Sequence, residues 1–108
     1  MLDINEVVCE VKTLVKKLQE SECFVKCKFE QVQETPKSYR LFIDFPNCMG
    51  ELMINEPECA PYHFVKFEAI ADILGVPTLV VSWYSQKYDT LEDIALHLAQ
   101  AINSAAKY

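Results

Sequence analysis

Two stretches of helical apolar spacing enclose a stretch in which the spacing changes to alternation. Between residues 4 and 18, and again between residues 91 and 105, apolar side chains recur every three or four positions. At about 100° per residue each set falls on one side of a helix, so each helix must bury that side against a shared layer. The two sets are Ile4, Val7, Val8, Val11, Leu14, Val15 and Leu18, and Leu91, Ile94, Ala95, Leu98, Ala101, Ile102 and Ala105.

The ends of both helices are marked by capping chemistry. Asp3 can accept a hydrogen bond from a backbone N–H of the first turn of the first helix, and Glu6 follows three residues later, which is the spacing of a capping box. Thr90 and Asp93 have the same spacing at the start of the last helix. Lys16 and Lys17 suit the negative end of the first helix dipole. We therefore expect helices over about residues 3–20 and from residue 90 onward.

The intervening residues predict strands. Residues 25–30 and 39–45 alternate apolar with polar side chains and are joined around Thr35 and Pro36, which predicts an antiparallel hairpin. Residues 46–50 form a turn into a third strand around residues 52–54. The last strand covers residues 78–84, with Leu79, Val81 and Trp83 on one face and Val80, Ser82 and Tyr84 on the other.

Residues 61–74 allow two interpretations. Pro61 could begin a helix that buries Phe64, Phe67, Ala71 and Leu74 and ends at Gly75. Alternatively, residues 62–68 form a strand followed by an irregular turn. The aromatic and β-branched side chains of this segment favour the strand.

The order helix, four or five strands, helix is typical of an α+β fold. With 108 residues, 51% of them hydrophobic, residues 1–108 can form one domain with its own core. We expect a single two-layer domain, in which an antiparallel sheet of four or five strands carries the N-terminal and the C-terminal helix on one face.

The opposite sheet face is predicted to be apolar. Alternation places Phe42, Met53, Val80 and Tyr84 there, with Tyr62 or Phe64 beside them. A face with this many large apolar groups predicts a homodimer contact or a ligand surface. Two alternatives remain: loops could cover the face, or a register shift of one residue would exchange the faces. The predicted dimer or ligand face comprises Phe42, Met53, Phe64, Val80 and Tyr84.

Most of the negative charge lies in the middle of the chain. Residues 44–72 hold six acids and one lysine, and therefore five of the six net negative charges. This favours a basic protein partner and disfavours nucleic acid, since clustered basic residues are absent and Arg40 is the only arginine. The predicted partner-binding residues are Glu51, Glu56, Glu58 and Tyr62.

Few residues have the spacing of a catalytic or metal site. Gly50 and Gly75 are the only glycines, so a phosphate-binding loop is disfavoured. Cys59 and His63 could line a pocket together with Trp83, but one cysteine and one histidine do not make a zinc signature. The acids Asp44, Glu51, Glu56 and Glu58 fit a solvated rim better than a cation site. We expect no catalytic residue, metal or cofactor.

The remaining cysteines and His97 have ordinary structural interpretations. Five cysteines at irregular spacing predict reduced thiols rather than disulfides. Cys9 lies opposite the apolar arc of the first helix and should be exposed, whereas Cys23 and Cys27 are expected as core and edge thiols of a strand. His97 is expected at the surface of the last helix.

In size, charge and layout the chain is similar to immunity proteins and antitoxins that block basic nuclease toxins, and to small products of mobile gene cassettes. This similarity implies a non-enzymatic interaction protein, an acidic homodimer that binds a basic protein. The alternative is a small-molecule binding domain or modest enzyme with a pocket between sheet and helices. Because the N-terminus lacks the pattern of a signal peptide and no apolar stretch approaches about 20 residues, we expect a cytoplasmic protein without membrane contact.

Overall fold

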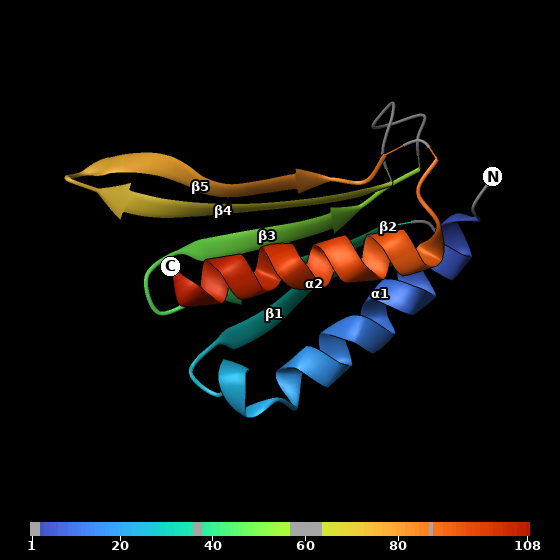
Figure 1. Cartoon of the computed structure of the whole chain (residues 1–108), viewed down its shortest axis with the longest axis horizontal. Helices are drawn as coiled ribbons and strands as arrows, with labels where there is room; N and C mark the ends of the chain where they lie inside the picture. Colours follow the sequence, from blue (N-terminus) through green and yellow to red (C-terminus); the bar gives the residue numbers. More distant parts are fainter. Residues whose placement is uncertain (1–2, 36–37, 57–63, 87) are drawn as a thin grey trace.

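The chain folds into two layers, one of strands and one of helices. A computed structural model describes residues 3–35, 38–56, 64–86 and 88–108. The five strands form one antiparallel sheet in chain order, and both helices lie against the same sheet face (Figure 1). The predicted α+β fold is therefore confirmed. The elements are α1 (Ile4–Gln19), the 3₁₀ helix η1 (Glu22–Phe24), β1 (Lys28–Thr35), β2 (Ser38–Asp44), β3 (Met49–Ile54), β4 (Val65–Ile73), β5 (Val76–Tyr84) and α2 (Leu91–Lys107).

Both helices begin at the predicted caps. The Asp3 carboxylate accepts a hydrogen bond from the backbone N–H of Asn5 at 2.9 Å. At the start of α2, the N–H of Asp93 donates to the Thr90 hydroxyl at 3.1 Å, while the N–H of Thr90 donates to the Asp93 carboxylate at 3.0 Å. This reciprocal pair satisfies two backbone donors that the first turn of a helix cannot satisfy internally.

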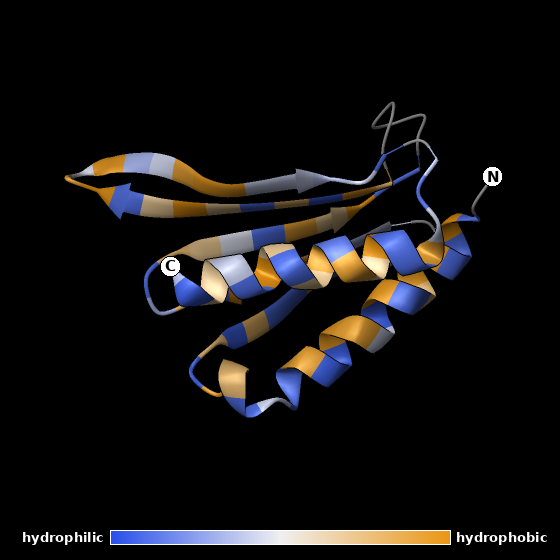
Figure 2. Cartoon of the chain, in the orientation of Figure 1, coloured by the Kyte–Doolittle hydropathy of each residue, from blue (hydrophilic) through white to orange (hydrophobic). Residues whose placement is uncertain are grey.

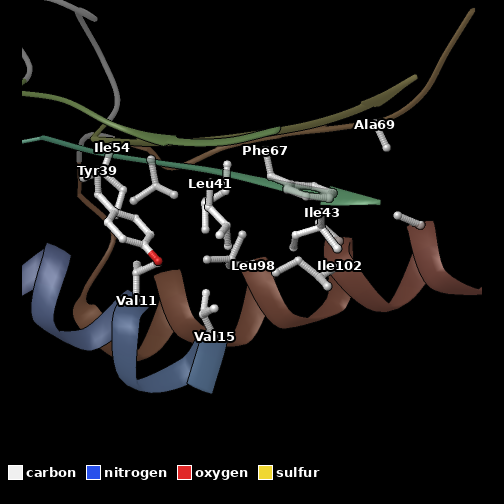
Figure 3. Packing of buried hydrophobic residues seen from close by; sticks show 14 of the residues in the cluster. Val11, Val15, Tyr39, Leu41, Ile43, Ile54, Phe67, Ala69, Leu98 and Ile102 are labelled. Atoms are coloured by element: carbon white, nitrogen blue, oxygen red, sulfur yellow. The ribbon is translucent and has the colours of Figure 1, made fainter. Parts of the chain in front are cut away.

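The core fills the space between the sheet and the helices. Val11 and Val15 of α1 and Leu98 and Ile102 of α2 point toward the side chains of the central strands (Figure 3). The strands contribute the following buried side chains to this layer: Tyr39, Leu41, Ile43, Leu52, Ile54, Val65, Phe67, Ala69 and Ala71. All of them lie on the sheet face that carries the helices, and no described helix or strand packs on the other face.

Of the two interpretations of residues 61–74, the strand is correct from Val65 onward, whereas residues 61–63 lie outside the described ranges. The irregular turn predicted after residue 68 is wrong, because β4 stays paired with β5 as far as Ile73. Ser85 fixes the start of this strand. Its hydroxyl accepts hydrogen bonds from the N–H groups of Phe64 and Val65, each at 3.0 Å, and the residue is 1% exposed. Ser85 therefore joins the end of β5 to the beginning of β4.

The β4–β5 hairpin extends past the C-terminal end of α2 (Figure 1). Its two-residue turn consists of Leu74, with φ 54°, and Gly75, with φ 81°. Two positive φ angles are typical of the type I′ turn that matches the twist of a hairpin. Glycine adopts this conformation readily, whereas it is strained for leucine. Leu74 is also 98% exposed.

A β-bulge changes the predicted faces of β5. The register shifts between Ala69 and Ile70, so that Val81 pairs with Ala69 while Leu79 pairs with Ile70, and Val80 has no partner. Leu79 therefore lies on the exposed sheet face rather than with Trp83, and Val80 is half-buried against the core. The strict alternation predicted for residues 78–84 is wrong because a bulge adds one residue to one strand of a pair.

The first strand begins later than the alternation of residues 25–30 predicts. Ser21 caps the short helix η1 by accepting a hydrogen bond from the N–H of Cys23 at 3.3 Å. Phe24 is buried at the end of η1, whereas Val25 is 78% exposed in the following turn. Burial of the phenylalanine ring favours this turn over an extension of the strand.

Candidate interaction surface

The sheet face that carries no helix, here called the open face, holds a row of side chains across all five strands. Register pairs align these residues side by side, and three of the five are glutamates. Glu51 and Glu68 stand directly opposite each other on β3 and β4. Like charges in this position destabilise a sheet unless cations offset them. The row, from β1 to β5, is Glu30, Phe42, Glu51, Glu68 and Ser82.

Two cations offset the facing glutamates. The Arg40 guanidinium contacts the Glu51 carboxylate at 2.5 Å and lies 5.3 Å from the centre of the Phe42 ring. Lys66 lies 3.3 Å from the Glu68 carboxylate, which also accepts a hydrogen bond from the Tyr84 hydroxyl at 2.8 Å. Both ion pairs remain partly open to solvent, so a cationic side chain of a partner could reach the carboxylates.

An apolar region adjoins the carboxylate row. Met49, Ile70 and Leu79 are paired across β3, β4 and β5, and each is about half exposed. Three further exposed apolar residues lie at the turn of the hairpin, which is largely orange in Figure 2. Two of them, Ile73 and Val76, form a register pair on the other face of the sheet. We call this set the apolar end: Met49, Ile70, Ile73, Leu74, Val76 and Leu79.

The structure places the predicted partner-binding residues in different regions. Glu51 lies on the open face in an ion pair, and Glu56 lies half-buried just beyond β3. Glu58 and Tyr62 lie outside the described residues. Glu68 faces Glu51, but the sequence analysis did not single it out as a partner-binding residue. The register between β3 and β4 brings the two glutamates together, and no local pattern in the sequence indicates that register.

The predicted dimer or ligand face is only partly assembled. Phe42, Met53 and Tyr84 lie on the open face, where the first two are half-buried among the ion-paired side chains. Phe64 and Val80 are half-buried and pack against the core. The more exposed apolar residues of this face are Met49, Ile70 and Leu79 of the apolar end, which the sequence did not single out because the bulge at Val80 and the extent of β4 were not apparent.

Of the predicted pocket, only Trp83 can be placed, since Cys59 and His63 lie outside the described residues. Its ring faces the helices, with its centre 6.4 Å from that of exposed His97 on α2. The two rings border an open groove of about 640 Å³ between β5 and α2. A second groove, of about 950 Å³, runs between α1 and β1 and is crossed by the ion pair of Lys12 and Glu34.

The described cysteines differ in exposure. Cys9 is exposed as predicted, Cys23 is exposed rather than in the core, and Cys27 is half-buried. Cys48 is buried, and its thiol donates to the carbonyl of Ala105 at 3.4 Å. Burial raises the pKa of the Cys27 thiol, assisted by Asp44, and burial together with nearby Cys27 raises the pKa of Cys48. A raised pKa disfavours the reactive thiolate.

The described part of the chain contains no group of three or more histidine, cysteine or acidic side chains placed to hold a metal ion. Within the same ranges, neither helix is long and apolar enough to cross a bilayer. No family model matches the chain, and no curated protein or solved structure matches it.

Proposed function

We propose that this chain is a small, non-enzymatic interaction protein that forms a homodimer and holds a basic protein partner, in the manner of immunity proteins and antitoxins. The observation that carries the proposal is the open face, where facing carboxylates stand beside an uncovered apolar region. Apolar groups supply most of the energy of association, and charged groups select the partner and speed its approach. A basic protein with an adjacent apolar patch fits this combination.

The facing pair of Glu51 and Glu68 supports a cationic contact. Each carboxylate already has one cation beside it, Arg40 or Lys66, on the same face. A partner lysine or arginine approaching between the carboxylates would relieve their mutual repulsion, because it could interact with both at once. Phe42 and Tyr84 flank the pair and would limit access of water to the contact.

The proposal is tested by substituting Glu68 with glutamine. Basic proteins retained from a lysate of the native host would be identified, and their association rates with wild-type and Glu68→Gln protein measured at several salt concentrations. We expect roughly tenfold slower association for the variant at low salt, with a shallower salt dependence, because one carboxylate no longer steers the encounter.

The control is Glu92→Gln, which removes the same charge from exposed Glu92 on α2, away from the open face. Compared at 0.1 M salt, where screening limits the reach of a distant surface charge to about 10 Å, it should change the association rate by less than about twofold and by less than Glu68→Gln does. Equal rates for wild-type and Glu68→Gln protein would contradict the proposed contact. Retention of no basic protein at low salt would contradict the proposed class of partner.

A further inference from the structure

The open face is divided into three rows of side chains that run across the strands. Register pairs align Arg40, Met53 and Lys66 in the first row, which supplies two cations. The carboxylate row comes next, with Glu51 and Glu68 on the central strands. On β3 and β4 consecutive rows are two residues, and therefore about 7 Å, apart. The third row, here called the apolar row, is Met49, Ile70 and Leu79.

The cations already on the open face reach the carboxylates from the side away from the apolar row, since the backbone positions of Arg40 and Lys66 lie there. On β3, β4 and β5 the other side is the apolar row, whose three side chains are each about half exposed. The described strands carry five acidic and three basic residues on this face, a net charge of −2: Glu30, Asp44, Glu51, Glu68 and Asp72, and Lys28, Arg40 and Lys66. A further cation is therefore favoured at the boundary between the carboxylate row and the apolar row.

The spacing of the apolar row matches one side of an α-helix. Neighbouring strands are about 4.8 Å apart, and side chains three or four positions apart on a helix are about 5–6 Å apart. Successive apolar side chains of a helix lying across the strands can therefore contact Leu79, Ile70 and Met49 in turn. Such a helix is about 10 Å wide, so it also reaches the carboxylate row about 7 Å away. Side chains on one side of an extended strand are about 7 Å apart, which does not match the row.

We propose that the open face binds a basic amphipathic helix of the protein partner, lying across β3, β4 and β5. This inference rests on the proposed function and specifies the form of the basic partner. Large apolar residues along one side of the helix would cover the apolar row, and lysine or arginine residues beside them would contact Glu51 and Glu68. The helices of a second copy do not meet this requirement, because both have their apolar sides in the core of their own chain (Figure 1).

The test uses two synthetic peptides of identical composition, made of leucine, lysine and alanine and long enough to form a helix, about 18 residues. In the helical peptide the leucines recur every three or four positions with lysines along one flank, whereas in the extended peptide leucine and lysine alternate. Isothermal titration calorimetry at low salt measures their binding to the wild-type protein. We expect the helical peptide to bind roughly tenfold more tightly, and its helical circular dichroism signal to increase on binding.

Two variants of β4 locate the contact. Ile70→Thr removes part of the apolar row, and Ile73→Thr makes the same change on the other face of the same strand, where the exposure is similar, 41% against 49%. We expect Ile70→Thr to weaken binding of the helical peptide about fivefold, because about half of an isoleucine side chain would no longer be buried on binding. Ile73→Thr should change it by less than about twofold. Glu68→Gln should weaken binding and make it less sensitive to salt.

Equal binding of the two peptides, or equal effects of Ile70→Thr and Ile73→Thr, would overturn the helix contact. The proposed function would still stand if association of basic proteins from the host lysate depended on Glu68. Binding of neither peptide and of no basic protein would overturn both. Sedimentation velocity of the same variants tests the other occupant of this face. A dimer that is lost in Ile70→Thr, with peptide binding unchanged, would assign the apolar row to a second copy and overturn this inference.

Discussion

Of the two glycines, Gly50 is the one at which a side chain would be crowded. It is buried in β3, and a Cβ atom there would lie 2.8 Å from Cζ of Phe67 and 2.9 Å from Cε2 of Phe45. Those two rings pack edge to face, with their centres 6.3 Å apart. We expect Gly50→Ala to lower the free energy of unfolding by about 1–3 kcal/mol, because the rings must leave their packing positions. Urea unfolding followed by circular dichroism measures this change.

A double-mutant cycle separates crowding from other effects of the alanine. Phe67→Leu shortens the side chain that the new methyl group would meet, so the combined variant should be less destabilised than the sum of the two single variants. Gly75→Ala serves as a comparison, since its Cβ would meet nothing within 4 Å and its cost arises from the positive φ of 81°. Simple additivity of Gly50→Ala and Phe67→Leu would contradict the steric explanation.

At the scale of single residues, the sequence predicted some site positions and missed others for identifiable reasons. Cys9 could be assigned to the surface because its helical angle alone decides its exposure. The position of Glu51 on the open face followed from alternation with buried Leu52. Glu68 and Ile70 were missed because their neighbours on β3 depend on strand register, which is set by contacts distant in sequence.

At the scale of elements, the helices were predicted nearly to the residue and the strands less well. Helical periodicity and capping act locally, so residues 3–19 and 90–107 contain the information that defines α1 and α2. The bulge in β5 and the helix η1 were not predictable in the same way. Both depend on tertiary contacts: the shifted pairing of β5 with β4, and the burial of Phe24.

The capping box of α2 should make the free energy of unfolding depend on pH in the acidic range. Hydrogen bonds from the backbone and side chain of Thr90 lower the pKa of the Asp93 carboxyl below its ordinary value. A carboxyl whose pKa is lower in the folded state stabilises the fold above its unfolded pKa, about 4, and this contribution is lost as the pH falls through the folded value. We expect Asp93→Asn to be less stable than the wild type near neutral pH.

Thermal unfolding between about pH 7 and pH 2 tests this dependence, and the two proteins should converge at the acidic end of the range. Asp72→Asn is the control, because it removes an exposed carboxylate of β4 that caps no helix. It should follow the pH profile of the wild type more closely than Asp93→Asn does. A constant difference between wild type and Asp93→Asn at every pH would contradict a role for the ionised carboxylate.

At the scale of the whole molecule, two helices cover one face of a five-stranded sheet and leave three surfaces for association. β1 carries charged side chains, the open face combines carboxylates with Met49, Ile70 and Leu79 of the apolar end, and β5 carries no charge. The two proposed contacts therefore use different forces. The basic partner would be held across charged groups, whereas the second copy of the proposed homodimer would be held by apolar contact against the mutual repulsion of two acidic chains.

The two contacts should respond to salt in opposite directions. The Debye length falls from about 30 Å at 0.01 M salt to about 10 Å at 0.1 M, so added salt screens both repulsion and attraction. The dimer dissociation constant should decrease over this range, while binding of a basic partner should weaken. Sedimentation equilibrium measures the first quantity and surface-based binding the second. Glu20→Gln combined with Glu22→Gln changes the net charge from −6 to −4 at exposed positions, and should make the dimer less sensitive to salt because the two copies repel one another less. A dimer that dissociates as salt is added would instead be held by attraction between charged groups, which would contradict this expectation.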